Sequence, residues 1–405
     1  MEITLFRKNE IKQEFFENLF LSIYIEIDFS NDSYVKLLKN YYGNFNLLND
    51  NKSKIDSLSP IQERYRNNSV KYLHDYELVG FLCKKQVISR SFFKLYEMIY
   101  HEPIILSERL NCFFICEAPG GFIDCVGDIR KKKNKHFDYL TTSIRKGIIY
   151  SQYIDTERIF YSDITLLENI DYMIEKSRNK FPNGVDLVTG DGGFNVKYFH
   201  AQEIISSKLI FSEIILALSI QKHGGTFILK VFDMFTHNTN MFYLLLCSCY
   251  SYVKIIKPRA SRYSNSERYL ICYSFRGISN SLIKKLRRIH ELFVSTNSVT
   301  TIIFPDFSFG KNQYLQNWYC SKIKLFNDVF IQFQIKTIQD SIKMAKSNDL
   351  YFQNLIMKIF EKEDILNYKN ILKNKIKKCI MFLKEFNINT NNIGYQINGT
   401  NNQWI

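Results

Sequence analysis

Four charged residues lie beside apolar stretches of the sequence. Burying a charge there is costly unless the charge is paired or has a function. Asp191 ends the apolar run "VDLVTG", and Lys230 directly follows "GTFIL". Glu267 precedes the apolar run "RYLICYSF", and Lys94 lies in the segment "SRSFFKLYEM". Each alone is explained as a strand-end charge that reaches solvent, but the four together favour a reaction site. A lysine that has lost its proton can serve as a general base, and neighbouring carboxylates can orient it.

A glycine turn at residues 116–122, "CEAPGGF", is a second candidate site. The chain has only 16 glycines and 6 prolines in 405 residues, and three of these stand together just after the apolar run "CFFI". Glycine allows a sharp turn and lets a ligand approach the backbone closely. Such a turn between a strand and a helix is typical of a cofactor-binding loop, although the motif is weak by itself.

Alternating strands and helices are predicted to hold these residues. Buried strands are expected to enter the glycine turn, to precede Asp191 and to end at Lys230, with helical sequence between them. This alternation predicts an open α/β sheet of mainly parallel strands. The short connection "RASRYSNS" indicates that the last two strands are antiparallel, as in methyltransferase sheets rather than dinucleotide dehydrogenases. A long helix is expected over 206–225, with a glycine pair at its C-terminal end.

The chain is long enough for two or three domains. Residues 1–85 lack a clear pattern and are interpreted as an N-terminal extension. Residues 86–278 contain the strand–helix alternation and form the predicted catalytic domain. Residues 279–405 are interpreted as a helical, basic C-terminal region that ends in a polar tail over 387–405.

The composition of the chain indicates which partners and which cellular environment to expect. The chain carries 54 Lys plus Arg against 40 Asp plus Glu, a formal net charge of +14, which favours nucleic acid first and an anionic membrane second as partner. An AT-rich coding sequence would also enrich lysine, so the charge alone carries little weight. The nine cysteines form no C-x-x-C pair and are interpreted as reduced core residues of an intracellular protein. No signal peptide and no apolar run of about 18 residues is visible, so no membrane span is expected.

The segment 86–278 resembles the FtsJ-like family of RNA ribose 2′-O-methyltransferases. The strings "GDGGFNV", "LKVFDMFT" and "KPRASRYSNSERYLIC" are most similar to the cap-specific branch found in eukaryotes and large DNA viruses. The resemblance implies an α/β fold, a Rossmann-like S-adenosylmethionine-dependent methyltransferase sheet with helices on both faces. It also implies a catalytic Lys-Asp-Lys-Glu tetrad, which is matched here by Lys94, Asp191, Lys230 and Glu267. Lys94 rests on the weaker match "SRSFFKLYE".

S-adenosylmethionine is the methyl donor that the resemblance implies, and no metal is expected. The implied donor-binding residues are Cys116, Glu117, Ala118, Pro119, Gly120, Gly121, Phe122, Asp163 and Asp191. Phe114 stands where the family often has an acidic residue, so Glu117 is expected to take over that acidic role. Asp163, in "YSDIT", matches the family's acidic position near the adenine, but it would also serve as the N-cap of the helix that follows.

Capped RNA is the substrate that the resemblance implies, with methyl transfer to the ribose 2′-hydroxyl of the first transcribed nucleotide. Lys230 is then the base, and Lys94 is expected to lower its pKa as a neighbouring cation. Phosphate contacts are expected from four residues that lead into Glu267, namely Arg259, Ser261, Arg262 and Asn265. Capping or transcription machinery is a candidate protein partner. Two alternatives stay open: a ribosomal or transfer RNA 2′-O-methyltransferase, and a non-catalytic RNA-binding subunit that retains the fold.

Overall fold

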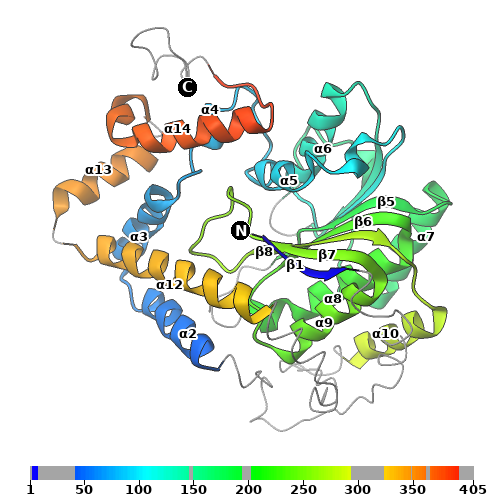
Figure 1. Ribbon diagram of the computed structural model, residues 1–405. Helices are drawn as coiled ribbons and strands as arrows, with labels where there is room; N and C mark the ends of the chain where they lie inside the picture. The colour runs from blue at the N-terminus through cyan, green and yellow to red at the C-terminus, as the bar shows by residue number, and fades with distance from the viewer. Residues whose placement is uncertain are drawn as a thin grey trace.

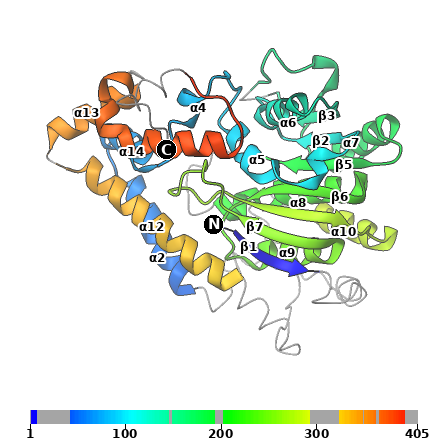
Figure 2. The ribbon, with the colours of Figure 1, turned by 45° about the horizontal axis from the view of Figure 1, so that its top comes forward.

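The computed structural model describes residues 2–7, 42–145, 149–193, 202–292, 323–347, 349–361 and 365–391. Within these residues the chain forms an eight-stranded sheet with helices on both faces, and further helices lie beside it (Figure 1). Figure 2 shows two of these further helices, α2 and α12, side by side along one side of the sheet. The predicted α/β class is confirmed.

The strand order in the sheet is β1-β7-β8-β6-β5-β2-β3-β4. The strands from β6 to β4 in this order are parallel, whereas β8 pairs antiparallel with both β6 and β7, and β1 pairs antiparallel with β7. The predicted antiparallel ending is therefore confirmed. The strands are β1 (Glu2–Arg7), β2 (Asn111–Ile115), β3 (Asp138–Ser143), β4 (Ile159–Tyr161), β5 (Val185–Gly190), β6 (Gln221–Val231), β7 (Tyr250–Ile256) and β8 (Arg268–Phe275).

The described helices fall into two groups, those that cover the sheet and those that lie beside it. Helices over the sheet are α5 (Ser91–Ile99), α6 (Gly121–Lys132), α7 (Leu167–Lys180), α8 (Gln202–Ile220), α9 (His237–Cys249) and α10 (Asn280–Leu292). The others are α2 (Tyr42–Asp56), α3 (Pro60–Leu73), α4 (Val79–Leu82), α12 (Leu325–Ala345), α13 (Leu350–Glu361) and α14 (Lys369–Glu385).

Successive side chains of β2 point to opposite faces of the sheet and so divide the core into two layers. Phe113 and Ile115 pack in the layer formed with α7, α8 and α9. Cys112 and Phe114 pack in the opposite layer, with α5, α6 and α14. All four side chains are fully buried. A strand that is apolar on both faces is what a central parallel strand requires, and it explains the continuous run "CFFI".

One edge of the sheet collects the ends of several strands. Ile115 of β2 pairs with Gly190 of β5, and Gly190 pairs with Leu229 of β6. Because β8 runs in the opposite direction, its first residue, Arg268, pairs with Val231 near the end of β6. The residues that follow β2 and β5, that end β6 and that precede β8 are therefore brought to one place.

The prediction of a helix over 206–225 is wrong at the C-terminal end. Helix α8 ends at Ile220, and β6 begins at Gln221. Gly224 has a positive φ of 78°, and the β5–β6 register shifts next to it. The glycine pair therefore belongs to an irregular start of β6 rather than to a helix cap.

The regions before and after the catalytic segment pack on it and on each other. β1 pairs with β7, α3 and α2 pack against α12, and α14 packs against α4. The domain boundaries after residues 85 and 278 stay predictions, and most of the expected polar tail, from residue 392 onward, lies outside the described residues.

The eight cysteines in the described ranges are free thiols. Among the residues that the structure describes, no helix has both the length and the apolar character to cross a membrane.

Candidate active site

Lys94 and Glu267 form an ion pair at this edge of the sheet. The Nζ atom of Lys94, on α5, lies 2.8 Å from Glu267 Oε1, and the Ser261 hydroxyl donates to the same oxygen at 2.7 Å. Burial disfavours the charged form of Glu267, but Lys94, Lys257 and Lys230 outweigh burial and lower its pKa to about 2. Glu267 is therefore an ionised carboxylate among three lysines.

Lys230 and Asp191 form the second pair. Lys230 Nζ lies 3.1 Å from Asp191 Oδ1 and donates to the backbone oxygen of Asp191 at 2.6 Å. The hydroxyl of Tyr269, the partner of Lys230 in β8, donates to Asp191 Oδ1 at 3.0 Å. The side chains of both pairs are between 12% and 16% exposed, so they are largely desolvated but accessible from outside. The structure thus brings the four predicted residues together as two lysine–carboxylate pairs.

The charge of Lys230 differs from the expectation. Burial lowers the pKa of Lys230, but the carboxylates of Asp191 and Glu267 outweigh burial, so its pKa lies above the ordinary value. Lys94 has its own carboxylate partner in Glu267, which offsets its positive charge. The expectation that Lys94 makes Lys230 a neutral base is therefore wrong for this arrangement, in which Lys230 is a cation at neutral pH.

Sequence reasoning missed Lys257, a fully buried lysine just after β7. Its Nζ donates to the backbone oxygens of Glu267 at 2.6 Å and of Asn265 at 3.0 Å, so it joins the two ends of the loop 257–267. Burial lowers the pKa of Lys257 well below its ordinary value, although Glu267 opposes this shift. The rule that marked Lys230, a lysine directly after an apolar strand, would also have marked the string "VKIIK".

The glycine turn lies directly after β2 and leads into α6. Gly120 has a φ of 111°, and a Cβ atom there would lie 2.7 Å from Ile154. A Cβ atom on Gly121 would clash with the hydroxyl oxygens of Ser89 and Ser91. The positive φ of Gly120 favours glycine there, and a side chain at either position would displace the neighbouring side chains.

Glu117 is buried within the turn, with 3% of its surface exposed. Its Oε1 accepts a hydrogen bond from the Phe122 amide at 2.5 Å, whereas Oε2 has no partner within the described ranges. Burial, and after it the charge of Asp191, raises the pKa of Glu117 well above its ordinary value. A positively charged ligand between Glu117 and Asp191 would offset the repulsion that raises the pKa of Glu117 and would favour its ionised form, so this part of the site fits a cationic cofactor.

Glu213, on α8, supports the loop that follows Asp191. Its Oε1 accepts a hydrogen bond from the Gly192 amide at 2.9 Å. The side chain is fully buried, and burial raises its pKa to about 8. Glu213 is therefore mostly protonated at neutral pH while it holds the loop in place.

Asp163 lies beyond the end of β4 and is exposed. Its Oδ1 accepts hydrogen bonds from the amide and the hydroxyl of Thr165, at 2.9 and 2.7 Å. Asp163 thus caps the turn that leads into α7, although the helix itself begins later, at Leu167. Its contact with the adenine of a donor stays a prediction.

The segment that contains the two lysine–carboxylate pairs and the glycine turn is similar in sequence to known proteins. Residues 87–275 match the model of a family described as FtsJ-like methyltransferase. We call these residues the FtsJ-like segment, after the family whose model they match. The FtsJ-like segment contains both lysine–carboxylate pairs and the glycine turn.

The relatives of the FtsJ-like segment include proteins named for cap methylation. Cap-specific mRNA (nucleoside-2′-O-)-methyltransferase 2 of Drosophila melanogaster is 28% identical over 66% of this chain and 41% of its own length. Cap-specific mRNA (nucleoside-2′-O-)-methyltransferase 1 of Trypanosoma brucei brucei is 30% identical over 47% of this chain and 54% of its own length. The Xenopus laevis protein of the same name is 30% identical over 51% of this chain and 27% of its own length. The chain therefore spans from about a quarter to about half of the length of these relatives.

Two predicted RNA contacts in the FtsJ-like segment, Arg259 and Arg262, have carboxylate partners within the chain. Arg259 donates to Glu97 at 3.1 Å and to Glu385 of α14 at 2.8 Å. Arg262 donates to Glu77 through two nitrogens, at 2.9 and 2.5 Å. Both arginines therefore attach the loop 257–267 to neighbouring elements, and their contact with RNA stays a prediction.

The other two predicted RNA contacts, Ser261 and Asn265, also bond within the loop. Ser261 donates to Glu267, and Asn265 Oδ1 accepts from Lys257 at 2.5 Å. These bonds orient the loop around the ionised Glu267. Contact of Ser261 and Asn265 with RNA likewise stays a prediction.

Proposed function

We propose that this chain methylates capped RNA, transferring a methyl group from S-adenosylmethionine to the ribose 2′-hydroxyl of the first transcribed nucleotide. The observation that carries the proposal is the convergence of two pairs, Lys94–Glu267 and Lys230–Asp191, beside the glycine turn. The names of the relatives support capped RNA as the substrate. Capping or transcription machinery inside the cell is the proposed setting.

The residues around the turn are proposed to hold the donor. When bound, S-adenosylmethionine supplies an electrophilic methyl group on a positively charged sulfur. The backbone at 116–121 forms the cradle, and Asp191 lies beside it. The raised pKa of Glu117 favours its neutral form, and a bound cation would lower that pKa and favour the ionised form. The unpartnered Oε2 of Glu117 is the observation that fits a cationic ligand here. Asp163, at the end of β4, is proposed to contact the adenosine part.

Lys230 is proposed to act on the 2′-hydroxyl. Its neutral form accepts the hydroxyl proton while the oxygen attacks, and Asp191 holds Nζ in position through two oxygens. The neutral form is scarce at pH 7, because Asp191 and Glu267 raise the pKa of Lys230 against the effect of burial. Lys94 and Glu267 complete the wall of the site, so that much of the acceleration comes from positioning.

The test is incubation of the full chain with labelled methyl donor and matched capped and uncapped oligonucleotides, followed by nuclease mapping of the labelled sugar. We expect label on the first nucleotide of capped RNA. The preference for the cap is expected to survive raised salt, because stacking on the cap guanine is screened less than phosphate contacts are.

Other outcomes of this experiment would select the alternatives. Equal methylation of both RNAs at every salt concentration would overturn the cap assignment and favour an enzyme of the ribosomal or transfer RNA type. Label on a later nucleotide would show that the enzyme methylates a different nucleotide of the RNA from the one proposed. No label from a folded protein would favour a non-catalytic subunit.

A further inference from the structure

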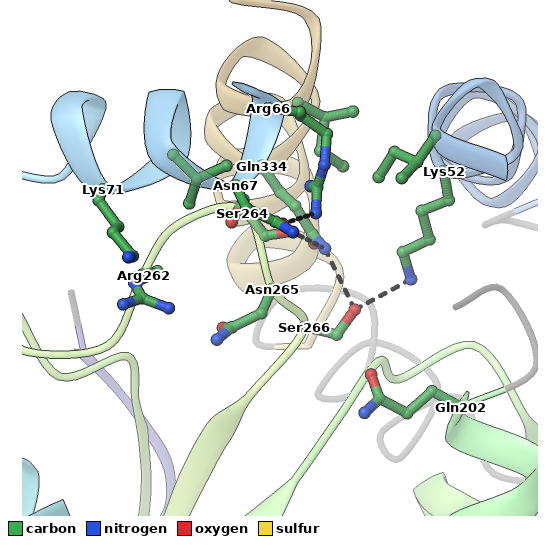
Figure 3. Close-up of a pocket in the computed structure, with 13 residues that line it drawn as sticks. Lys52, Arg66, Asn67, Lys71, Gln202, Arg262, Ser264, Asn265, Ser266 and Gln334 are labelled. Atoms are coloured by element: carbon green, nitrogen blue, oxygen red, sulfur yellow. Dashed lines mark hydrogen bonds between the residues drawn. The ribbon is translucent and has the colours of Figure 1, made fainter. Parts of the chain in front are cut away.

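A cavity of about 380 Å³ lies between the appended helices and the loop that precedes β8 (Figure 3). Its wall includes Lys52 of α2, Arg66 and Lys71 of α3, and Gln334 of α12. These helices lie outside residues 87–275, so the cavity is an addition to the FtsJ-like segment. Its size is within the usual range of small-ligand sites.

The charged side chains that line the cavity are all positive. They are Lys52, Arg66, Lys71 and Arg262. Two of them are neutralised, since Lys52 lies 2.5 Å from an oxygen of Asp233 and Arg262 lies 2.5 Å from an oxygen of Glu77. Arg66 and Lys71 have no ion pair with any residue that the structure describes. The cavity therefore has an excess of positive charge.

Arg66 is the more telling of these two cations, because only 9% of its surface is exposed. Its Nη2 donates to Asn67 Oδ1 at 2.5 Å, while its Nε is buried with no hydrogen-bond partner in the described part of the chain. Gln334 is fully buried and lines the same cavity, and its Oε1 also has no partner there. Burial lowers the pKa of Arg66, and the carboxylate of Glu63 only partly opposes this shift, so an arriving anion would offset part of the cost of burying the guanidinium.

We propose that this cavity binds a nucleotide, with Arg66 and Lys71 holding its phosphate. The planar fork of a guanidinium matches the oxygens of a phosphate. Asn265 and Ser266 line the cavity, and the next residue is Glu267 of the candidate active site. The nucleotide is either part of the RNA substrate or free. A free nucleotide takes the inference beyond the proposed function, whereas a nucleotide of the RNA substrate deepens the proposed function and rests on it.

The test is direct binding to the full chain, measured by calorimetry with guanosine monophosphate and, separately, with a short uncapped RNA. The variants are Arg66→Gln and Lys71→Met, and the control is Lys54→Met on an exposed position of α2. We expect Arg66→Gln and Lys71→Met each to weaken binding about tenfold or more, as the loss of a charge-assisted hydrogen bond does, and the control to bind like the original protein.

Two outcomes support the proposal and distinguish the source of the nucleotide. If the RNA competes with guanosine monophosphate, and Lys71→Met weakens the binding of the RNA, the occupant is RNA. If guanosine monophosphate binds and the RNA does not compete with it, the occupant is a free nucleotide. The proposal is overturned if neither compound binds, or if Lys71→Met binds both as the control does. Lys71 is only half-buried, so its variant decides even if Arg66→Gln fails to fold. Methyl transfer is not the readout, so failure of the proposed function is detected separately.

Discussion

Lys52 of α2 and Asp233, just after β6, form a buried ion pair with Nζ and Oδ2 2.5 Å apart. The Ser266 hydroxyl lies 2.9 Å from each of these two atoms. Burial disfavours the charged form of Asp233, but Lys52 and Arg268 outweigh it and keep its pKa below the ordinary value. A helix from the N-terminal region is thereby fixed to the residue next to Glu267.

Replacing Lys52 by Met is expected to lower the free energy of unfolding by about 3–5 kcal/mol, because Asp233 would stay buried without its nearest cation. Urea denaturation measures the change. Lys54→Met, at an exposed position of the same helix, is the control and should change stability by less than about 0.5 kcal/mol. Equal stability of the two variants would contradict the presence of the pair in solution.

Replacing Lys230 by Met is expected to slow methyl transfer by about 10²–10⁴-fold, the usual cost of losing a general base. Donor binding, measured by calorimetry, should change little, because Lys230 acts on the hydroxyl rather than on the donor. Lys222→Met, on the same strand with 51% of its side chain exposed, is the matched control. Activity of the Lys230 variant within a few-fold of the original would remove Lys230 from the catalytic role.

The pH dependence of a single turnover tests the charge of Lys230. Its pKa lies above the ordinary 10.5, because Asp191 and Glu267 outweigh the effect of burial. The neutral fraction of a base grows about tenfold per pH unit below its pKa, so the rate should rise with that slope between about pH 7 and 9. Glu267, with a pKa of about 2, stays ionised and adds no slope. A flat profile would mean that Lys230 acts as a cation and not as the base.

Glu213 should make the protein less stable as the pH rises. Its carboxyl group has a pKa of about 8 in the folded chain because of burial, against an ordinary value of 4.5. Between these values the folded state binds more protons than the unfolded state, so the free energy of unfolding falls as the pH rises from about 5 to 8.

The variant Glu213→Gln keeps an acceptor for the Gly192 amide and cannot ionise. Its unfolding free energy, from urea titrations across this pH range, should therefore fall less steeply than that of the original protein. Glu291→Gln, at an exposed position of α10, is the control. Identical slopes for Glu213→Gln and the original protein would show that Glu213 is already ionised at low pH.

The sheet and the four paired residues could be predicted because their signals are local. Asp191, Lys230 and Glu267 each adjoin an apolar run, and the ends of parallel strands meet at one edge. The C-terminal end of α8 could not be placed in this way, because it depends on the irregular pairing of β6 with β5.

The surroundings of the loop 257–267 could not be predicted, because its partners are distant in the sequence. Glu77 holds Arg262 across 185 positions, and Glu385 holds Arg259 across 126. The cavity beside Arg66 likewise depends on how α2, α3 and α12 pack, which no periodicity in the sequence specifies. The raised pKa of Lys230 depends on the balance of burial against two carboxylates, and residue types alone do not set that balance.

Strand β1 is synthesised long before β7, the strand with which it pairs. Glu2 pairs with Ile256, so the N-terminal strand leaves the ribosome long before β7 exists. Pairing across such a sequence separation is slow, and an unpaired strand is prone to pair with other chains. A nascent chain that is released before residue 250 would lack β7 and β8 and would carry β1 without a partner. Prematurely terminated products are therefore expected to aggregate rather than to fold.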